Sequence, residues 1–148
     1  MTDITPYYQA LALQTRCFAV NGMSADDAHQ RMNATIQRIG VQIRASKAFI
    51  GSDLKLVVLP EYFLTSFPTR ESIAQWQEIG CIRMDGPEYD ALGKVAQDNG
   101  VYLSGNVYEL DDHFPALYFQ TSFCIDPAGD VVLRYRRLNS MFAPTPHD

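Results

Sequence analysis

Basic side chains, long apolar runs and paired cysteines are all scarce in this sequence, and each shortage excludes a class of protein. The chain has 12 Lys and Arg against 17 Asp and Glu, which gives a formal net charge of -5. Because binding to nucleic acid depends on clustered basic groups, we expect no nucleic-acid partner. No apolar run approaches the roughly 20 residues that a membrane helix needs, and the start MTDITPYY lacks the basic-then-apolar order of a secretory signal. We therefore expect no membrane association and a cytoplasmic protein.

Residues that commonly hold metals or cofactors are also sparse. The three cysteines, Cys17, Cys81 and Cys124, form no CxxC pair, so neither a disulfide framework nor a zinc ribbon is indicated. The three histidines are far apart, and none is paired at metal-ligand spacing. No GxGxxG string follows the first predicted strand. We predict no metal and no cofactor, and we expect each cysteine to be a small packing residue.

The first half of the chain, in contrast, carries clear patterns of secondary structure. With 47% hydrophobic and 20% charged residues, the composition is typical of one globular domain. A strand is expected over residues 7–14, and a long helix is expected to begin at Ser24 and end at Gly51. A second strand is expected over residues 54–60, which are β-branched and leucine-rich. The helix is predicted from one apolar stripe, formed by Ala28, Met32, Ile36, Ile39, Ile43 and Ile50.

The second half adds two shorter helices and three strands. One helix is expected over residues 70–79 with Thr69 as its N-cap, and another is expected between Asp85 as N-cap and Gly100 as C-terminal glycine. Strands are expected over residues 101–109, 116–126 and 130–137, the last two joined by a Pro-Ala-Gly turn. This order predicts an α/β fold in which helices cover one face of a mixed sheet. We expect a single domain over residues 1–148.

The most informative string for chemistry is LVVLPE, which ends at Glu61. A hydrophobic strand here delivers a glutamate just past its carboxyl end, where α/β folds usually place their functional groups. Fenced by Tyr62, Phe63 and Phe67, this carboxylate is expected to be partly desolvated, as a general base working near neutral pH requires. Position alone leaves the alternative of a solvated glutamate at a strand end.

Four strings in the right order and spacing resemble the nitrilase superfamily of carbon-nitrogen hydrolases. LVVLPEYFLTSFP is similar to the superfamily's glutamate motif, and YYQALALQT is similar to its opening strand. DGPEYDALGKVAQDNGVYLSGNVYE resembles its second helix and following strand, and CIDPAGDVVLRYRRLN resembles its D-P-x-G to Y-R-K hairpin. The resemblance covers essentially the whole chain, and it implies a fold similar to part of the family's α-β-β-α sandwich.

The resemblance also implies a Glu-Lys-Cys triad that acts on small amides, nitriles or carbamoyl compounds. Cysteine is the nucleophile, glutamate the general base and lysine the group that stabilises the tetrahedral intermediate. Glu61 falls at the base. Arg137 falls at the lysine, where a planar guanidinium cannot reproduce a compact ammonium; a register shifted by one would place Arg136 there instead. The family's Tyr-Asn-Thr string is replaced by Phe119-Gln120-Thr121.

The family's nucleophile lies well after the lysine, and none of the three cysteines matches it. We therefore expect an amino-terminal portion, truncated at its carboxyl end and inactive alone, of a hydrolase that is homo-oligomeric when intact. Nitrilase, amidase, carbamoylase and N-acyltransferase branches share the triad, so the substrate stays open. Two alternatives remain: a catalytically inactive nitrilase-like interaction or oligomerisation module, and a generic α/β module in which the Pro-Glu string is coincidental.

Overall fold

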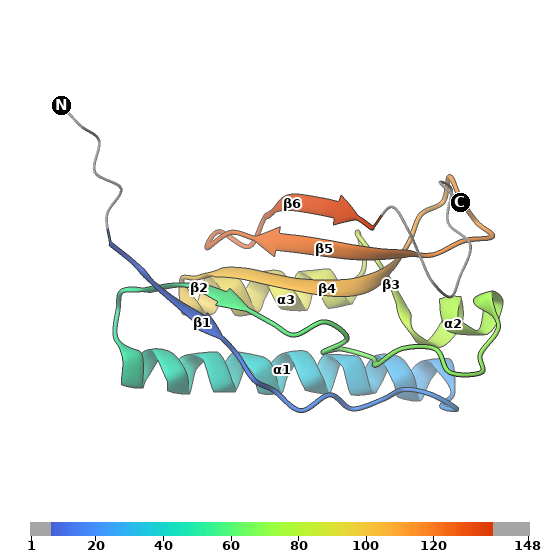
Figure 1. The fold of residues 1–148 in the computed structure, drawn as a ribbon, viewed down its shortest axis with the longest axis horizontal. Coiled ribbons are helices and arrows are strands. Elements are labelled where there is room, and N and C mark those ends of the chain that lie inside the picture. The colour runs from blue at the N-terminus through green and yellow to red at the C-terminus, as the bar shows by residue number, and fades with distance from the viewer. Residues whose placement is uncertain (1–6, 138–148) are drawn as a thin grey trace.

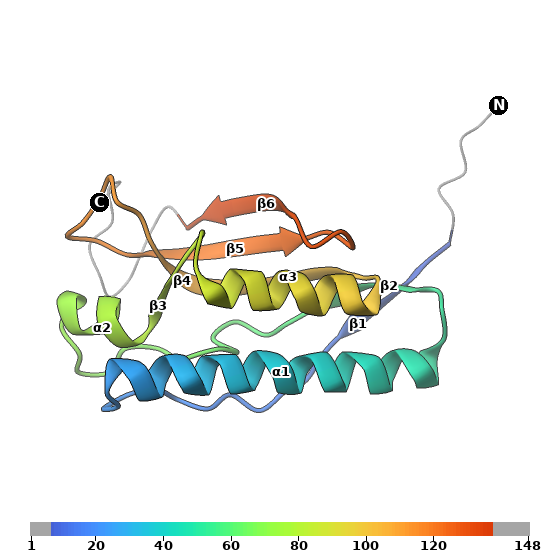
Figure 2. The ribbon, with the colours of Figure 1, turned by 180° about the vertical axis from the view of Figure 1, so that it is seen from behind.

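The computed structural model describes residues 7–137 and forms one mixed sheet with three helices. The predicted α/β fold, with helices over one face of a mixed sheet, is confirmed (Figures 1 and 2). In chain order the elements are β1 (Gln9–Ala12), α1 (Ala25–Ile50), β2 (Leu54–Val58), α2 (Ile73–Ile79), β3 (Cys81–Arg83), α3 (Pro87–Asn99), β4 (Tyr102–Leu110), β5 (Phe119–Ile125) and β6 (Val131–Arg136).

The sheet runs in the order β1-β2-β4-β5-β6, with β3 paired to β4. The pairs β1–β2, β2–β4 and β3–β4 are parallel. The pairs β4–β5 and β5–β6 are antiparallel. β2 and β3 both lie along β4: β2 ends opposite Ser104, and β3 begins opposite Tyr108. The chain therefore leaves the sheet after β2 and returns as β3, which pairs with a later part of the same strand, β4. Glu61 lies in the connection that starts at this exit.

The helical layer consists mainly of α1 and α3, which pack against each other. α3 lies behind β4 in Figure 1 and in front of it in Figure 2. The apolar stripe predicted for α1 is buried except for Ile50, which is half-buried. On α3, the predicted inward residues Leu92, Val95 and Ala96 are buried. Gly40 of α1 allows a close approach, because a Cβ there would stand 3.1 Å from a Val95 methyl group.

The sheet face turned away from the helices remains open among the described residues. Strand register places Val58, Ser104, Cys124 and Leu133 in one row across the sheet, since each pairs with the next. Paired residues share a face. Val58 and Leu133 are exposed although they are large and apolar, as is Tyr135 further along β6. One face of the sheet is thus the protein core, and the other carries exposed apolar side chains together with polar ones.

Four details of the predicted elements are wrong. The second helix is capped by Ser72 rather than Thr69, because Ser72 and Gln75 form a reciprocal capping box. The N–H of Thr69 instead donates to the Glu71 carboxylate. The third helix is capped by Gly86 rather than Asp85.

Residues 81–83, for which no element was predicted, form β3. A strand of three residues is too short to show alternation, and it forms because the backbone of β4 offers a parallel partner. Cys81 is therefore a buried strand residue. The first strand is also shorter than predicted, since its pairing with β2 covers only Gln9–Ala12.

Candidate active site

Glu61 follows β2 at the start of a sharp reversal of the chain. Tyr62 and Ser66 both adopt positive φ angles, of 60° and 69°, which L-residues seldom do. The turn directs Phe63 and Leu64 into the core, where they are almost fully buried. Glu61 itself is left at the rim of the open sheet face.

Three other side chains converge on this carboxylate. Gln120 Nε2 donates to Glu61 Oε1 over 2.6 Å and lies 3.0 Å from Asn106 Oδ1. Arg137 Nη1 lies 3.4 Å from the same Glu61 oxygen, and it also donates to Gln120 Oε1. The four residues come from four places: Glu61 from the loop after β2, Asn106 from the middle of β4, Gln120 from the start of β5 and Arg137 from the position after β6. The structure thus brings together both residues singled out in the sequence, Glu61 and Arg137.

Strand register explains why these residues meet. Arg136 pairs with Thr121, and the N–H of Arg137 donates to the carbonyl of Gln120 over 2.9 Å, so the β5–β6 pairing continues by one residue. Residues directly opposite one another in an antiparallel pair project to the same face. Arg137 and Gln120 therefore both project to the open face, where Asn106 also lies.

The expected desolvation of Glu61 is not found among the described residues. Its side chain is 53% exposed and that of Arg137 is 44% exposed. Phe63 lies in the core, Tyr62 stacks on Tyr108 with ring centroids 6.0 Å apart, and Phe67 is half-exposed, so these aromatics do not enclose the carboxylate. An ion pair so exposed contributes at most about 1 kcal/mol of stability. The contact between Glu61 and Arg137 therefore matters more for the relative orientation of the two side chains than for stability.

Asn106 was not recognised as a site residue from the sequence, and Gln120 was noted only as a departure from the family pattern. The signal was present in the strands themselves. Alternate residues of β4 (Ser104, Asn106) and of β5 (Gln120, Ser122) are polar, which is unusual for a sheet face buried in a core. Polar alternation in two neighbouring strands predicts a polar strip across the sheet.

The three cysteines differ in environment. Cys81 is buried and Cys124 is half-buried, but Cys17 is exposed, so the packing role expected for it is wrong. Its thiol instead donates to the carbonyl of Tyr62, with Sγ 3.0 Å from the oxygen, because the loop after β1 runs beside the Glu61 turn. Burial raises the pKa of the Cys81 and Cys124 thiols, and partial desolvation of Cys17, although its side chain is exposed overall, raises the pKa of that thiol as well. A raised pKa disfavours the thiolate, which is the nucleophilic form.

Residues 7–137 contain no group of three or more His, Cys, Asp and Glu side chains placed to hold a metal ion. In this same part of the chain, no helix combines the length and the apolar character needed to cross a membrane.

Known proteins are similar to this chain in sequence and in fold. Residues 9–147 match the family model described as carbon-nitrogen hydrolase. A formamidase of Bacillus cereus strain Q1 is 32% identical over 88 residues, which are 58% of this chain and 25% of that protein. A formamidase of Bacillus cereus strain B4264 is 31% identical over 104 residues, or 70% of this chain and 30% of that protein. The chain spans between a quarter and a third of these curated relatives.

Solved structures share the fold. Saccharomyces cerevisiae Nit3, a member of branch 10 of the nitrilase superfamily, superposes with a TM-score of 0.59 at 23% identity, over 74% of this chain and 40% of its own. An N-terminal amidase with an Asn-Glu peptide superposes with a TM-score of 0.65 at 16% identity, over 90% of this chain and 28% of its own. The family match extends over nearly all of the chain, and the protein therefore belongs to the carbon-nitrogen hydrolase family.

Proposed function

We propose that the protein hydrolyses the carbon-nitrogen bond of a small amide, with Glu61 as general base and Arg137 as the cation beside the reacting centre. The observation that supports this is the contact between Glu61 Oε1 and Arg137 Nη1 at 3.4 Å, bridged by the Gln120 amide. A carboxylate and a cation that share one polar corner can accept a proton and steady a developing oxyanion.

The reaction further needs a nucleophile, which in this family is a cysteine. We expect it outside the described residues. Glu61 would take the proton of that thiol, and the thiolate would attack the amide carbon to form a tetrahedral oxyanion beside the guanidinium of Arg137. The C–N bond would then break as Glu61 returns the proton to the leaving amine. Water, activated by the same carboxylate, would hydrolyse the thioester and release the acid.

A small amide is favoured over a larger acyl compound by the relatives. Two of the similar proteins are named formamidases, so formamide and short aliphatic amides are the first substrates to examine. Nitriles and carbamoyl compounds are proposed as the next class, because the same triad chemistry acts on them.

A second candidate function is a non-catalytic nitrilase-like module that works by oligomerisation or interaction. The feature that favours it is Arg137, an arginine where the resemblance implies the family's lysine. A guanidinium is planar and permanently charged, and here it is committed to both Glu61 and Gln120.

The two functions are separated by turnover of the protein expressed from its complete reading frame. We expect release of ammonia from formamide or a short aliphatic amide. Glu61→Gln should lower kcat by at least about 100-fold, because it removes the proton acceptor and keeps the shape of the side chain. Glu78→Gln is the matched control, since it makes the same change at an exposed glutamate of α2.

Unaltered turnover in Glu61→Gln would refute the role of this residue. A complete protein without turnover on amides, nitriles or carbamoyl compounds would favour the non-catalytic module.

A further inference from the structure

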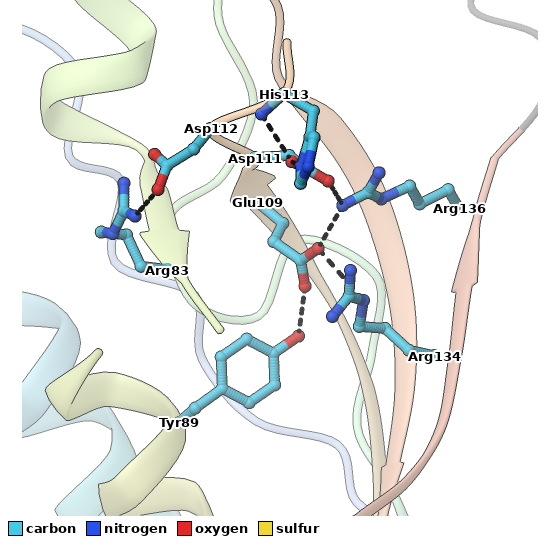
Figure 3. A network of polar contacts seen from close by, with 8 residues as sticks. All are labelled: Arg83, Tyr89, Glu109, Asp111, Asp112, His113, Arg134 and Arg136. Atoms are coloured by element: carbon cyan, nitrogen blue, oxygen red, sulfur yellow. Dashed lines mark hydrogen bonds and ion pairs between the residues drawn. The ribbon is translucent and has the colours of Figure 1, made fainter. Parts of the chain in front are cut away.

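Glu109 is a fully buried carboxylate near the end of β4, and it lies among charged side chains from β6 (Figure 3). Tyr89 of α3 donates its hydroxyl to Glu109 Oε2 over 3.0 Å. Arg134 Nε lies 3.3 Å and Arg136 Nη2 lies 3.2 Å from Glu109 Oε1. A buried carboxylate without such partners costs several kcal/mol. The two guanidinium groups and the hydroxyl offset that cost.

Arg136 is held on more than one side. Its Nη2 lies 2.5 Å from Asp111 Oδ2 in addition to its contact with Glu109. Its Cζ lies 4.1 Å from the centroid of the Phe119 ring, in a cation–π contact. Burial acts to lower the pKa of Arg136, but the hydrogen bonds to Asp111 and Glu109 outweigh it and raise that pKa above its usual range. The guanidinium is therefore fixed in position and remains charged.

The covalent neighbour of this fixed residue is Arg137. Consecutive side chains of an extended strand point to opposite faces. Arg136 points toward the helical side, where Glu109 meets Tyr89 of α3, and Arg137 points to the open face, where it contacts Glu61. The peptide unit between them is planar and rigid. Fixing the direction of one side chain therefore fixes the starting direction of the other.

We propose that Glu109 is a positioning residue, which acts through Arg136 to set where the Arg137 guanidinium stands relative to Glu61. In the described sheet β6 pairs with β5 alone, so the side-chain contacts of Arg136 add to the single line of backbone hydrogen bonds that ends with Arg137 N–H donating to the Gln120 carbonyl. A buried ionic network adds little net stability compared with an apolar core, and its best-attested use is to specify one geometry. Functional groups must be held within about 0.5 Å of their working positions.

Its effect on turnover rests on the proposed function, but its effect on geometry does not. The test uses four variants of the protein expressed from its complete reading frame. Glu109→Gln keeps the shape of the side chain and removes its charge. Arg136→Gln breaks the same link from the other side and serves if Glu109→Gln does not fold. Asp112→Asn is the matched control, because Asp112 is an exposed carboxylate that contacts Arg83 of β3.

The two readouts are the crystal structure of each variant and its kcat and KM. We expect Arg137 Nη1 to move beyond about 4 Å from Glu61 Oε1 in Glu109→Gln and Arg136→Gln, with kcat lowered about 100-fold and KM little changed. Asp112→Asn should match the parent in both. Arg136→Lys should restore part of kcat, since it returns a cation to Glu109.

An Arg137 guanidinium that stays in place in both Glu109→Gln and Arg136→Gln would overturn the proposal. Displacement of Arg137 in a protein whose turnover is also insensitive to Glu61→Gln would support the positioning role and refute the proposed function instead.

Discussion

Gln120 links the two charged residues of the candidate site, because its amide donates to Glu61 and accepts from Arg137. A neutral amide satisfies both a carboxylate and a guanidinium without changing the net charge of the pair. The same nitrogen is 3.0 Å from Asn106 Oδ1, so the orientation of Gln120 is itself fixed from β4. Arg137 is consequently held by a network rather than by one exposed ion pair.

Replacing Arg137 by lysine tests whether the guanidinium limits the reaction. We expect Arg137→Lys to raise kcat in the complete protein, by about tenfold for each 1.4 kcal/mol of added transition-state stabilisation. The reason is that a compact ammonium concentrates its charge at one point, whereas a planar guanidinium is constrained by Gln120. Amide turnover is the measurement, and Arg44→Lys on the exposed side of α1 is the control. Unchanged or lower kcat would mean that arginine is the better cation at this position.

Elements differed in how well the sequence predicted them, and α1 and β3 are the two extremes. α1 has 26 residues, a side-chain cap at Ser24 and an apolar stripe that runs from Ala28 to Ile50, so local patterns suffice to define it. β3 has three residues and exists because the backbone of β4 pairs with it. β3 forms because of a tertiary contact with β4, so no local pattern in the sequence predicts it.

The candidate site shows the same division. Glu61 was found because it follows a recognisable strand, and Arg137 was found by its place in a familiar string. Glu109 was not singled out, because nothing in GNVYEL distinguishes a fully buried glutamate from an exposed one. Its burial depends on Tyr89 and Arg136, which come from other elements. Interactions between distant segments are therefore what the sequence alone leaves out.

The contact between α1 and α3 includes a titratable pair. His29 Nδ1 lies 2.7 Å from Glu88 Oε1, and Glu88 is buried. The hydrogen bond to Glu88 raises the pKa of His29 above 6.5, in spite of its partial burial, with Asp26 adding to the effect. Burial acts to raise the pKa of Glu88, but the bond from His29 and the backbone outweigh it and lower that pKa below 4.5. Both shifts favour the charged pair in the folded state.

This pair predicts a pH dependence of stability. The His29 contribution is fully present below pH 6.5 and is lost as the pH rises through the raised pKa. The Glu88 contribution is present above pH 4.5 and is lost as the pH falls through the lowered pKa. We expect the free energy of unfolding to fall between about pH 6 and about pH 8.5 by less than about 1 kcal/mol from this pair, since solvent screens His29.

Urea unfolding at the two pH values measures this difference. His29→Asn and Glu88→Gln should each reduce it, because each removes one partner of the pair. A pH dependence that is the same in the parent and in both variants would contradict the assignment.

At the scale of the whole molecule, the two faces of the sheet have opposite surroundings. The helices cover one face, whereas the other exposes Val58, Tyr102, Leu133 and Tyr135. Tyr135 pairs with Ser122, and Ser122 pairs with Asn106, so the exposed apolar residues of β6 lie on the same face as the polar residues of the candidate site and next to them. Contiguous exposed apolar surface commonly marks a contact region. A partner or further segment that covered this face would also exclude water from Glu61. It would then supply the desolvation of the carboxylate that the described residues do not provide.

Self-association of the 148-residue chain tests whether copies of the chain associate through the open face of the sheet. We expect its mass in light scattering to rise with concentration, because association removes apolar surface from water. Leu133→Thr with Tyr135→Thr should reduce that rise, since both side chains are more than half exposed on the open face. Val41→Thr with Phe49→Thr removes comparable apolar surface from α1 and is the matched control. If the α1 pair reduces association and the β6 pair does not, the copies meet through the helical layer, and Glu61 stays open to water in the assembly.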